Sequence, residues 1–200
     1  MNKLLARVIA LVLAATAGAA FAQQDPATLA KGVCSACHGP DGHSISSVFP
    51  NLAGQQPAYI ELQLDAFRDR QRADPNAQAY MWGMASQLSD DTIKGLAAYY
   101  AAKKPAPGKS GSPSLMAAGE KIYTQGIPAQ GVPACATCHG KQAQGANAFP
   151  RLAGQHVDYL VAQLEGFKSG LRSNAPIMLG VVRTLTSEQI RAVATYAASR

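Results

Sequence analysis

The chain has 200 residues, 48% of them hydrophobic and 6% aromatic, and a formal net charge of +6. This length suits either one domain or two small ones. No Lys/Arg run with interleaved aromatic residues accompanies the basic charge, so composition argues against a nucleic-acid partner.

The first 22 residues are typical of a secretory signal peptide. Lys3 and Arg7 flank the start of an apolar run at residues 8–17, and Ala20-Phe21-Ala22 has the small-x-small pattern of a cleavage site. The apolar run is too short for a bilayer-spanning helix, although an uncleaved N-terminal anchor is the alternative. We therefore expect cleavage after Ala22, export to the bacterial periplasm and a soluble mature chain.

After the leader, the predicted elements are short helices joined by long loops, without strand-like alternation. Asp25-Pro26 begins a helix that leads to the first cysteine pair. Pro57 fits a first helical position, and the apolar residues after it recur with largely helical spacing. Ser89 is a suitable N-cap for a further helix. These elements form the first expected domain, residues 23–102.

Residues 103–112 have a linker composition, rich in Pro, Gly, Ser and Lys. The second expected domain, residues 113–200, repeats the first, with a capping box at Thr186 and Gln189. Three motifs recur in the same order, namely Cys-x-x-Cys-His-Gly at 34–39 and 135–140, Phe-Pro-x-Leu-Ala-Gly-Gln at 49–55 and 149–155, and a Leu-Ser/Thr start at 88–93 and 185–190. The sequence thus predicts an all-α fold of two homologous domains.

Every cysteine lies in a Cys-x-x-Cys-His motif, which is the attachment pattern of c-type haem. Each pair of thiols can form thioethers to the two haem vinyl groups, and the adjacent histidine then binds the iron. A redox disulfide lacks the βαβ context of thioredoxin-like folds, and structural zinc does not need a histidine directly after each pair. We predict two covalent haem c groups, attached at Cys34, Cys37, Cys135 and Cys138, with His38 and His139 as iron ligands.

The sixth iron ligand of the first half has three candidates, Met81, Met84 and His43. Methionine is the usual partner of histidine in electron-carrying cytochromes. Met81 and Met178 precede the repeated Leu-Ser/Thr motif at equal spacing, whereas Met84 aligns with a valine. We predict Met81 and Met178 as axial ligands, with core filling as their alternative role. Met84 and Met116 are expected to be packing residues.

Pro50 and Pro150 follow the two haem histidines in sequence. A proline carbonyl can accept the Nδ1–H of His38 or His139, and such a bond fixes the imidazole tautomer and strengthens the ligand. The alternative is that the prolines only stiffen the loop. His43 and His156 have no counterpart in the other half, and we expect both at the surface.

The whole mature chain resembles cytochrome c4, in which two class I cytochrome c domains follow one another. The resemblance implies pseudo-twofold symmetry, each domain wrapped around one covalent haem, and propionates hydrogen-bonded across the interface. It also implies that the iron ligands are His38, Met81, His139 and Met178. The chain departs from the family in a short approach to Cys34 and an insertion, residues 124–134.

By resemblance, the protein is expected to be a monomeric periplasmic electron carrier rather than an enzyme. Such carriers are soluble or loosely membrane-attached, with a quinol-oxidising complex as donor and a terminal oxidase as acceptor. One alternative is an enzyme with an open or unusually ligated iron, such as a diheme peroxidase or a thiosulfate-oxidising cytochrome. Another is the cytochrome subunit of a flavin-dependent sulfide dehydrogenase, which needs a permanent flavoprotein partner.

Overall fold

The computed structural model describes residues 25–200, so the predicted leader and its cleavage site lie outside the described residues. Within this range, helices are joined by loops, and pairing of extended segments is limited to two isolated bridges, Ile127 with Val132 and Ala146 with Phe149. The all-α prediction is confirmed. No helix between residues 25 and 200 combines the length and apolarity needed to cross a membrane.

The first half begins helices where the sequence predicts them. Asp25 caps the helix that starts at Pro26 through its carboxylate, and Pro57 opens a helix of 12 residues. The Ser89 hydroxyl accepts the backbone N–H of Thr92 at 3.2 Å. Two five-residue segments, η1 and η2, are π-helical, which the sequence pattern did not predict. The elements in order are α2 (Pro26–Leu29), η1 (Ala30–Cys34), α3 (Ser35–His38), α4 (Pro57–Arg68), η2 (Ala77–Met81), α5 (Trp82–Ala85) and α6 (Asp90–Ala101).

The second half repeats this order without π-helical turns among its described elements. The predicted insertion forms a short 3-10 turn, and Thr186 and Gln189 make the expected capping box at the start of the last helix. The elements are α7 (Pro113–Gln125), η3 (Pro128–Gln130), α8 (Ala136–His139), α9 (Val157–Lys168), α10 (Pro176–Val182) and α11 (Ser187–Ala198).

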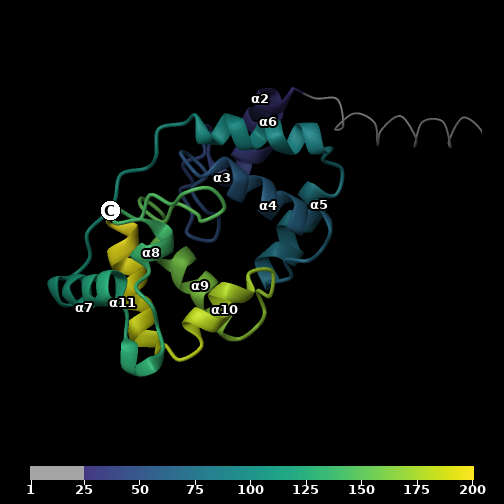
Figure 1. Cartoon of the computed structure of the whole chain (residues 1–200). Helices are drawn as coiled ribbons and strands as arrows, with labels where there is room; N and C mark the ends of the chain where they lie inside the picture. Colours follow the sequence, from purple (N-terminus) through teal and green to yellow (C-terminus); the bar gives the residue numbers. More distant parts are fainter. Residues whose placement is uncertain (1–24) are drawn as a thin grey trace, which may run out of the picture.

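Each half has its own apolar core. One cluster of buried side chains is drawn from residues 29–100, and two others are drawn from residues 122–198. The first and last helices of each half cross closely, α2 over α6 and α7 beside α11 (Figure 1). At the second crossing Gly119 lies against the carbonyl oxygen of Ala192 and the Cβ of Tyr196, which leaves no room for a side chain. The two cores fit two tandem cytochrome c domains, although the exact boundaries at residues 102 and 113 stay a prediction.

The segment between α6 and α7 runs along the outside of both halves (Figure 1). Pro105 lies against Gly54 of the first half, and Ala106 lies against Gly154 of the second. The backbone carbonyl of Lys104 accepts a hydrogen bond from Nε2 of His43 at 2.8 Å. The predicted linker is therefore packed on both halves at equivalent glycines.

Hydrogen bonds exchanged between the halves show the pseudo-twofold relation directly. Gln55 contacts Arg151, and its counterpart Gln155 contacts Asn51, which is the counterpart of Arg151. A second reciprocal pair lies next to it, where Gln56 donates to the carbonyl of Gln144 at 2.9 Å and His156 contacts the carbonyl of Ser44 at 3.0 Å. The halves thus meet through equivalent surfaces.

Candidate haem-attachment sites

The two cysteine pairs lie on the same structural element in both halves. Each pair ends in a single helical turn, α3 or α8, that stops at a glycine with φ near +80°, Gly39 or Gly140. This left-handed conformation suits glycine, because a Cβ there would meet neighbouring atoms at close range. The first cysteine of each pair directly precedes this turn, Cys34 at the end of η1 and Cys135 at the N-cap of α8. The second cysteine and the histidine lie within the turn.

All four cysteines are free thiols. Cys37 and Cys138 are exposed, whereas Cys34 and Cys135 are partly buried. Burial raises the pKa of both Cys34 and Cys135, to about 11 in the case of Cys135. Among residues 25–200, three or more His, Cys, Asp or Glu side chains are nowhere grouped as ligands of a metal ion.

The histidine after each cysteine pair is buried and oriented by a backbone carbonyl. Nδ1 of His38 lies 2.9 Å from the carbonyl oxygen of Pro50, and Nδ1 of His139 lies 3.0 Å from that of Pro150. Burial lowers the pKa of both imidazoles, and the carbonyl contact opposes the shift. A neutral ring that donates from Nδ1 keeps its lone pair on Nε2, which is the form that binds a metal.

The two methionines proposed as sixth ligands lie in different kinds of helix. Met81 is the last residue of η2, partly buried against the core of the first half. Met178 lies in the regular helix α10 and packs beside Val182 and its neighbours in the second half. Trp82, directly after Met81, donates its indole N–H to the carbonyl of Arg72 at 2.8 Å, which anchors the turn that carries Met81.

Three other predicted placements have different outcomes. Met84 does not pack, because 57% of its surface is exposed, so the expectation of a packing role is wrong. Met116 packs against the core of the second half as expected. His43 is exposed as predicted, but His156 is only partly exposed, because it hydrogen-bonds the carbonyl of Ser44 across the domain interface.

The donor set of each half fits a covalent haem. Each half offers two thiols at or directly before one helical turn, one neutral imidazole with an available nitrogen, and one thioether sulfur. Soft sulfur and imidazole nitrogen are the donors that iron in c-type cytochromes uses. The residues would hold the group through thioether bonds at the four cysteines and through iron bonds at His38, His139, Met81 and Met178.

The sequence pattern missed a buried polar network where α4 and α9 face each other. The guanidinium of Arg72 binds the Asp74 carboxylate at 2.8 Å and Oε1 of Gln163 at 2.7 Å, and only 4% of Arg72 is exposed. Arg172, the counterpart of Arg72, is equally buried and donates to Gln163 at 2.6 Å. The residue that corresponds to Asp74 in the second half is the neutral Asn174. The signal was present in the repeat, because Arg-x-Asp and Arg-x-Asn stand at equivalent positions.

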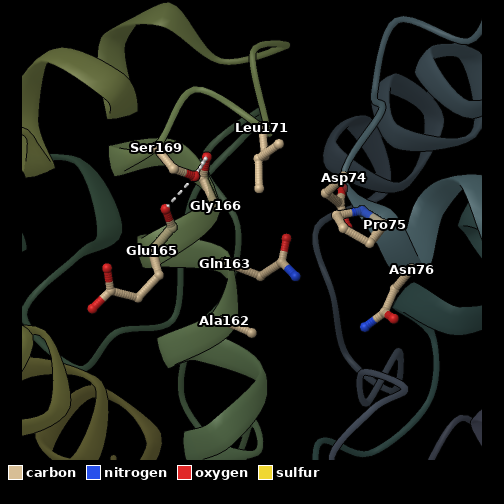
Figure 2. Close-up of a pocket in the computed structure, with 9 residues that line it drawn as sticks. All are labelled: Asp74, Pro75, Asn76, Ala162, Gln163, Glu165, Gly166, Ser169 and Leu171. Carbon is tan, nitrogen blue, oxygen red and sulfur yellow. Dashed lines mark hydrogen bonds between the residues drawn. The ribbon is translucent and has the colours of Figure 1, made fainter.

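A cleft of about 340 Å³ opens beside this network, between α9 and residues 74–76 (Figure 2). Figure 2 shows Gln163 of α9 facing Asp74 and Pro75 across it. Its two acidic groups are already engaged, Asp74 by Arg72 and Glu165 by the hydroxyl of Ser187. Both carboxylates of the cleft are therefore already hydrogen-bonded within the chain.

Known proteins share both the sequence and the architecture of this chain. The cytochrome c family model matches residues 23–101 and 116–199. Cytochrome c4 of Thiocapsa roseopersicina is 44% identical over 172 residues, which cover 84% of this chain and 86% of the relative. A thiosulfate dehydrogenase electron acceptor of Stutzerimonas stutzeri strain A1501 is 36% identical over 98% of this chain and 93% of its own length.

A solved structure agrees with these relatives. Cytochrome c4 of Acidithiobacillus ferrooxidans superimposes with a TM-score of 0.79 at 39% identity. The match covers 84% of this chain and 98% of that structure. The similarity therefore spans both halves and their relative arrangement.

Proposed function

Since the chain belongs to the cytochrome c4 family of diheme c-type electron-transfer proteins, we propose that it is an electron carrier whose two irons are each closed by a histidine and a methionine. The proposed ligands are His38 with Met81 and His139 with Met178. The observation that carries this proposal is the equivalent donor set in both halves. Neither half lacks a sixth-ligand candidate, which favours a carrier over an enzyme with an open iron.

When bound, each haem supplies a one-electron couple between ferric and ferrous iron. The histidine and methionine of each half would fill both axial positions of the iron and so keep substrates from binding it. The bonds from His38 and His139 to proline carbonyls hold each imidazole in one tautomer and one orientation. The indole of Trp82, bonded to the backbone at Arg72, holds the turn that ends at Met81.

We further propose the periplasm as the site of action, after cleavage behind Ala22, with the protein working as a monomer. The proposed donor is a quinol-oxidising complex and the proposed acceptor a terminal oxidase. The similarity to a thiosulfate dehydrogenase electron acceptor favours a second candidate, in which a thiosulfate-oxidising enzyme is the donor. In both cases the chain itself carries electrons between other redox proteins, through small transient contacts.

The first test is a haem count and a ferric absorption spectrum of the exported protein, with the weak methionine–iron charge-transfer band quantified per haem. We expect two covalent haems, each with a full methionine signal. A signal from one haem only would show that Met81 or Met178 is not a ligand and would favour an enzyme with an open iron.

The second test identifies the partners. Membrane vesicles that contain a quinol-oxidising complex should reduce the ferric protein when quinol is added, and vesicles with a terminal oxidase should oxidise the ferrous protein. A purified thiosulfate-oxidising enzyme with thiosulfate is the competing donor. Reduction only by the latter would move the protein to thiosulfate oxidation, and copurification with flavin would favour the sulfide dehydrogenase subunit.

A further inference from the structure

One glutamine side chain of each half hydrogen-bonds the backbone of the loop that supports the histidine in the other half. Oε1 of Gln155 accepts the backbone N–H of Asn51 at 2.9 Å, and its Nε2 donates to the carbonyl of Asn51 at 3.0 Å. Gln55 makes the same two contacts with the backbone of Arg151, at 2.7 and 3.0 Å. Each amide thus bonds both backbone groups of one residue across the interface.

The residues bonded by the glutamines, Asn51 and Arg151, directly follow the two prolines that contact the histidines. In the peptide group between Pro50 and Asn51, both the carbonyl and the N–H are therefore hydrogen-bonded. Its carbonyl accepts from Nδ1 of His38 at 2.9 Å, and its N–H donates to Gln155 at 2.9 Å. The peptide between Pro150 and Arg151 is occupied in the same way, by His139 at 3.0 Å and by Gln55 at 2.7 Å.

Hydrogen bonds at the two ends of a peptide group strengthen one another. Resonance makes a carbonyl a better acceptor when the N–H of the same peptide donates a hydrogen bond, and such chains gain about 10–30% in strength per bond. A stronger acceptor at Nδ1 makes the imidazole a more basic ligand. Gln55 is only 7% exposed and Asn51 and Gln155 are partly buried, so water competes weakly for these bonds.

We infer that Gln155 and Gln55 are positioning residues that tune the reduction potential of the haem in the opposite domain, each through the peptide that supports the other domain's histidine. The inference rests on the proposed axial ligands His38 and His139. A more basic histidine favours ferric iron, so each glutamine holds the potential of the opposite haem down. The electronic state of each site therefore depends on a side chain that its own half does not supply.

The test is the potential of each haem in Gln155→Leu and Gln155→Glu, measured by spectroelectrochemistry of the holoprotein. The methyl signals of Met81 and Met178 in paramagnetic NMR assign the potentials to the two haems. In Gln155→Leu we expect the first-domain haem to become easier to reduce, with its redox equilibrium constant changed about threefold, which is roughly 28 mV for one electron. Gln155→Glu keeps the acceptor of the Asn51 N–H and should shift the same haem in the opposite direction.

The matched control is Gln56→Leu, which removes a cross-interface bond to the carbonyl of Gln144 without touching either histidine-supporting peptide. It should leave both potentials unchanged, whereas Gln55→Leu should move only the second-domain haem. Equal movement of both haems in Gln155→Leu, or a shift no larger than that in Gln56→Leu, would overturn the inference. The haem count comes first, because without two covalent haems both the proposed function and the inference fail. A missing methionine band contradicts only the proposed methionine ligands, and an unmoved potential with both haems present refutes the inference alone.

Discussion

Replacement of Asp74 by asparagine tests the buried network between the halves. The Asp74 carboxylate is the acidic partner of Arg72 at 2.8 Å, and the two side chains are only 8% and 5% exposed. The substitution keeps the size of the side chain and removes its charge. It also reproduces the arrangement of the second half, where Asn174 lies beside Arg172.

The expected loss follows from the burial of the remaining charge. Removal of one partner of a buried ion pair costs about 3–5 kcal/mol, because the other charge is left uncompensated. Arg72 keeps its bonds to the amide oxygens of Gln63 and Gln163, at 3.0 and 2.7 Å. We therefore expect Asp74→Asn to lower the free energy of unfolding by about 3 kcal/mol, at the lower end of that range.

The assay is denaturant-induced unfolding of the holoprotein, followed by far-ultraviolet circular dichroism. The double variant Asp74→Asn/Asn174→Asp moves the carboxylate to the equivalent position beside Arg172. It should return to within about 1 kcal/mol of the parent if the charge balance of the network is what matters. A loss below about 1 kcal/mol in the single variant, or no recovery in the double variant, would refute this account of the network.

Four further substitutions test the ligands, the packing and a helix cap. Met81→Ala should remove the methionine–iron band of the first-domain haem only, and Met178→Ala should remove that of the second-domain haem only. Absorption and NMR spectra record both bands. Loss of both bands from one substitution would contradict the assignment. Gly119→Ala should lower the free energy of unfolding by about 2 kcal/mol, because its Cβ would overlap a carbonyl oxygen of α11. Gly180→Ala, in open space on α10, is its control and should be neutral or stabilising. Thr186→Ala should cost about 1 kcal/mol in thermal or denaturant unfolding through loss of the capping box, while Thr186→Ser should cost little.

Features set by neighbouring residues were predictable from the sequence. A proline at the first helical position predicted that α4 starts at Pro57, and hydroxyl N-caps predicted that α6 and α11 start directly after Ser89 and Thr186. The repeat also predicted Met178 as the counterpart of Met81, and the role of both as axial ligands stays a prediction. These inferences depend on contacts within a few residues or on the comparison of equivalent positions.

Features that depend on how the halves meet were not predictable in the same way. Arg72 and His156 are polar residues of kinds usually found at the surface. Gln163 of the other half contributes to the burial of Arg72, and the contact between the halves gives His156 its bond to Ser44. The packing role expected for Met84 is wrong, because α5 leaves its side chain exposed. The π-helical turn before Met81 adds a residue to a helical pattern, which apolar spacing over five residues does not reveal.

The close packing of Pro105 on Gly54 and of Ala106 on Gly154 has a kinetic consequence. A flexible tether lets two redox centres sample a range of separations, so electron exchange between them is spread over many rate constants. Here the connecting segment packs on both halves, and the neighbouring residues Gln55 and Gln155 also make hydrogen bonds between the halves. Electron exchange between the two centres should therefore follow a single exponential whose rate constant does not vary with solvent viscosity.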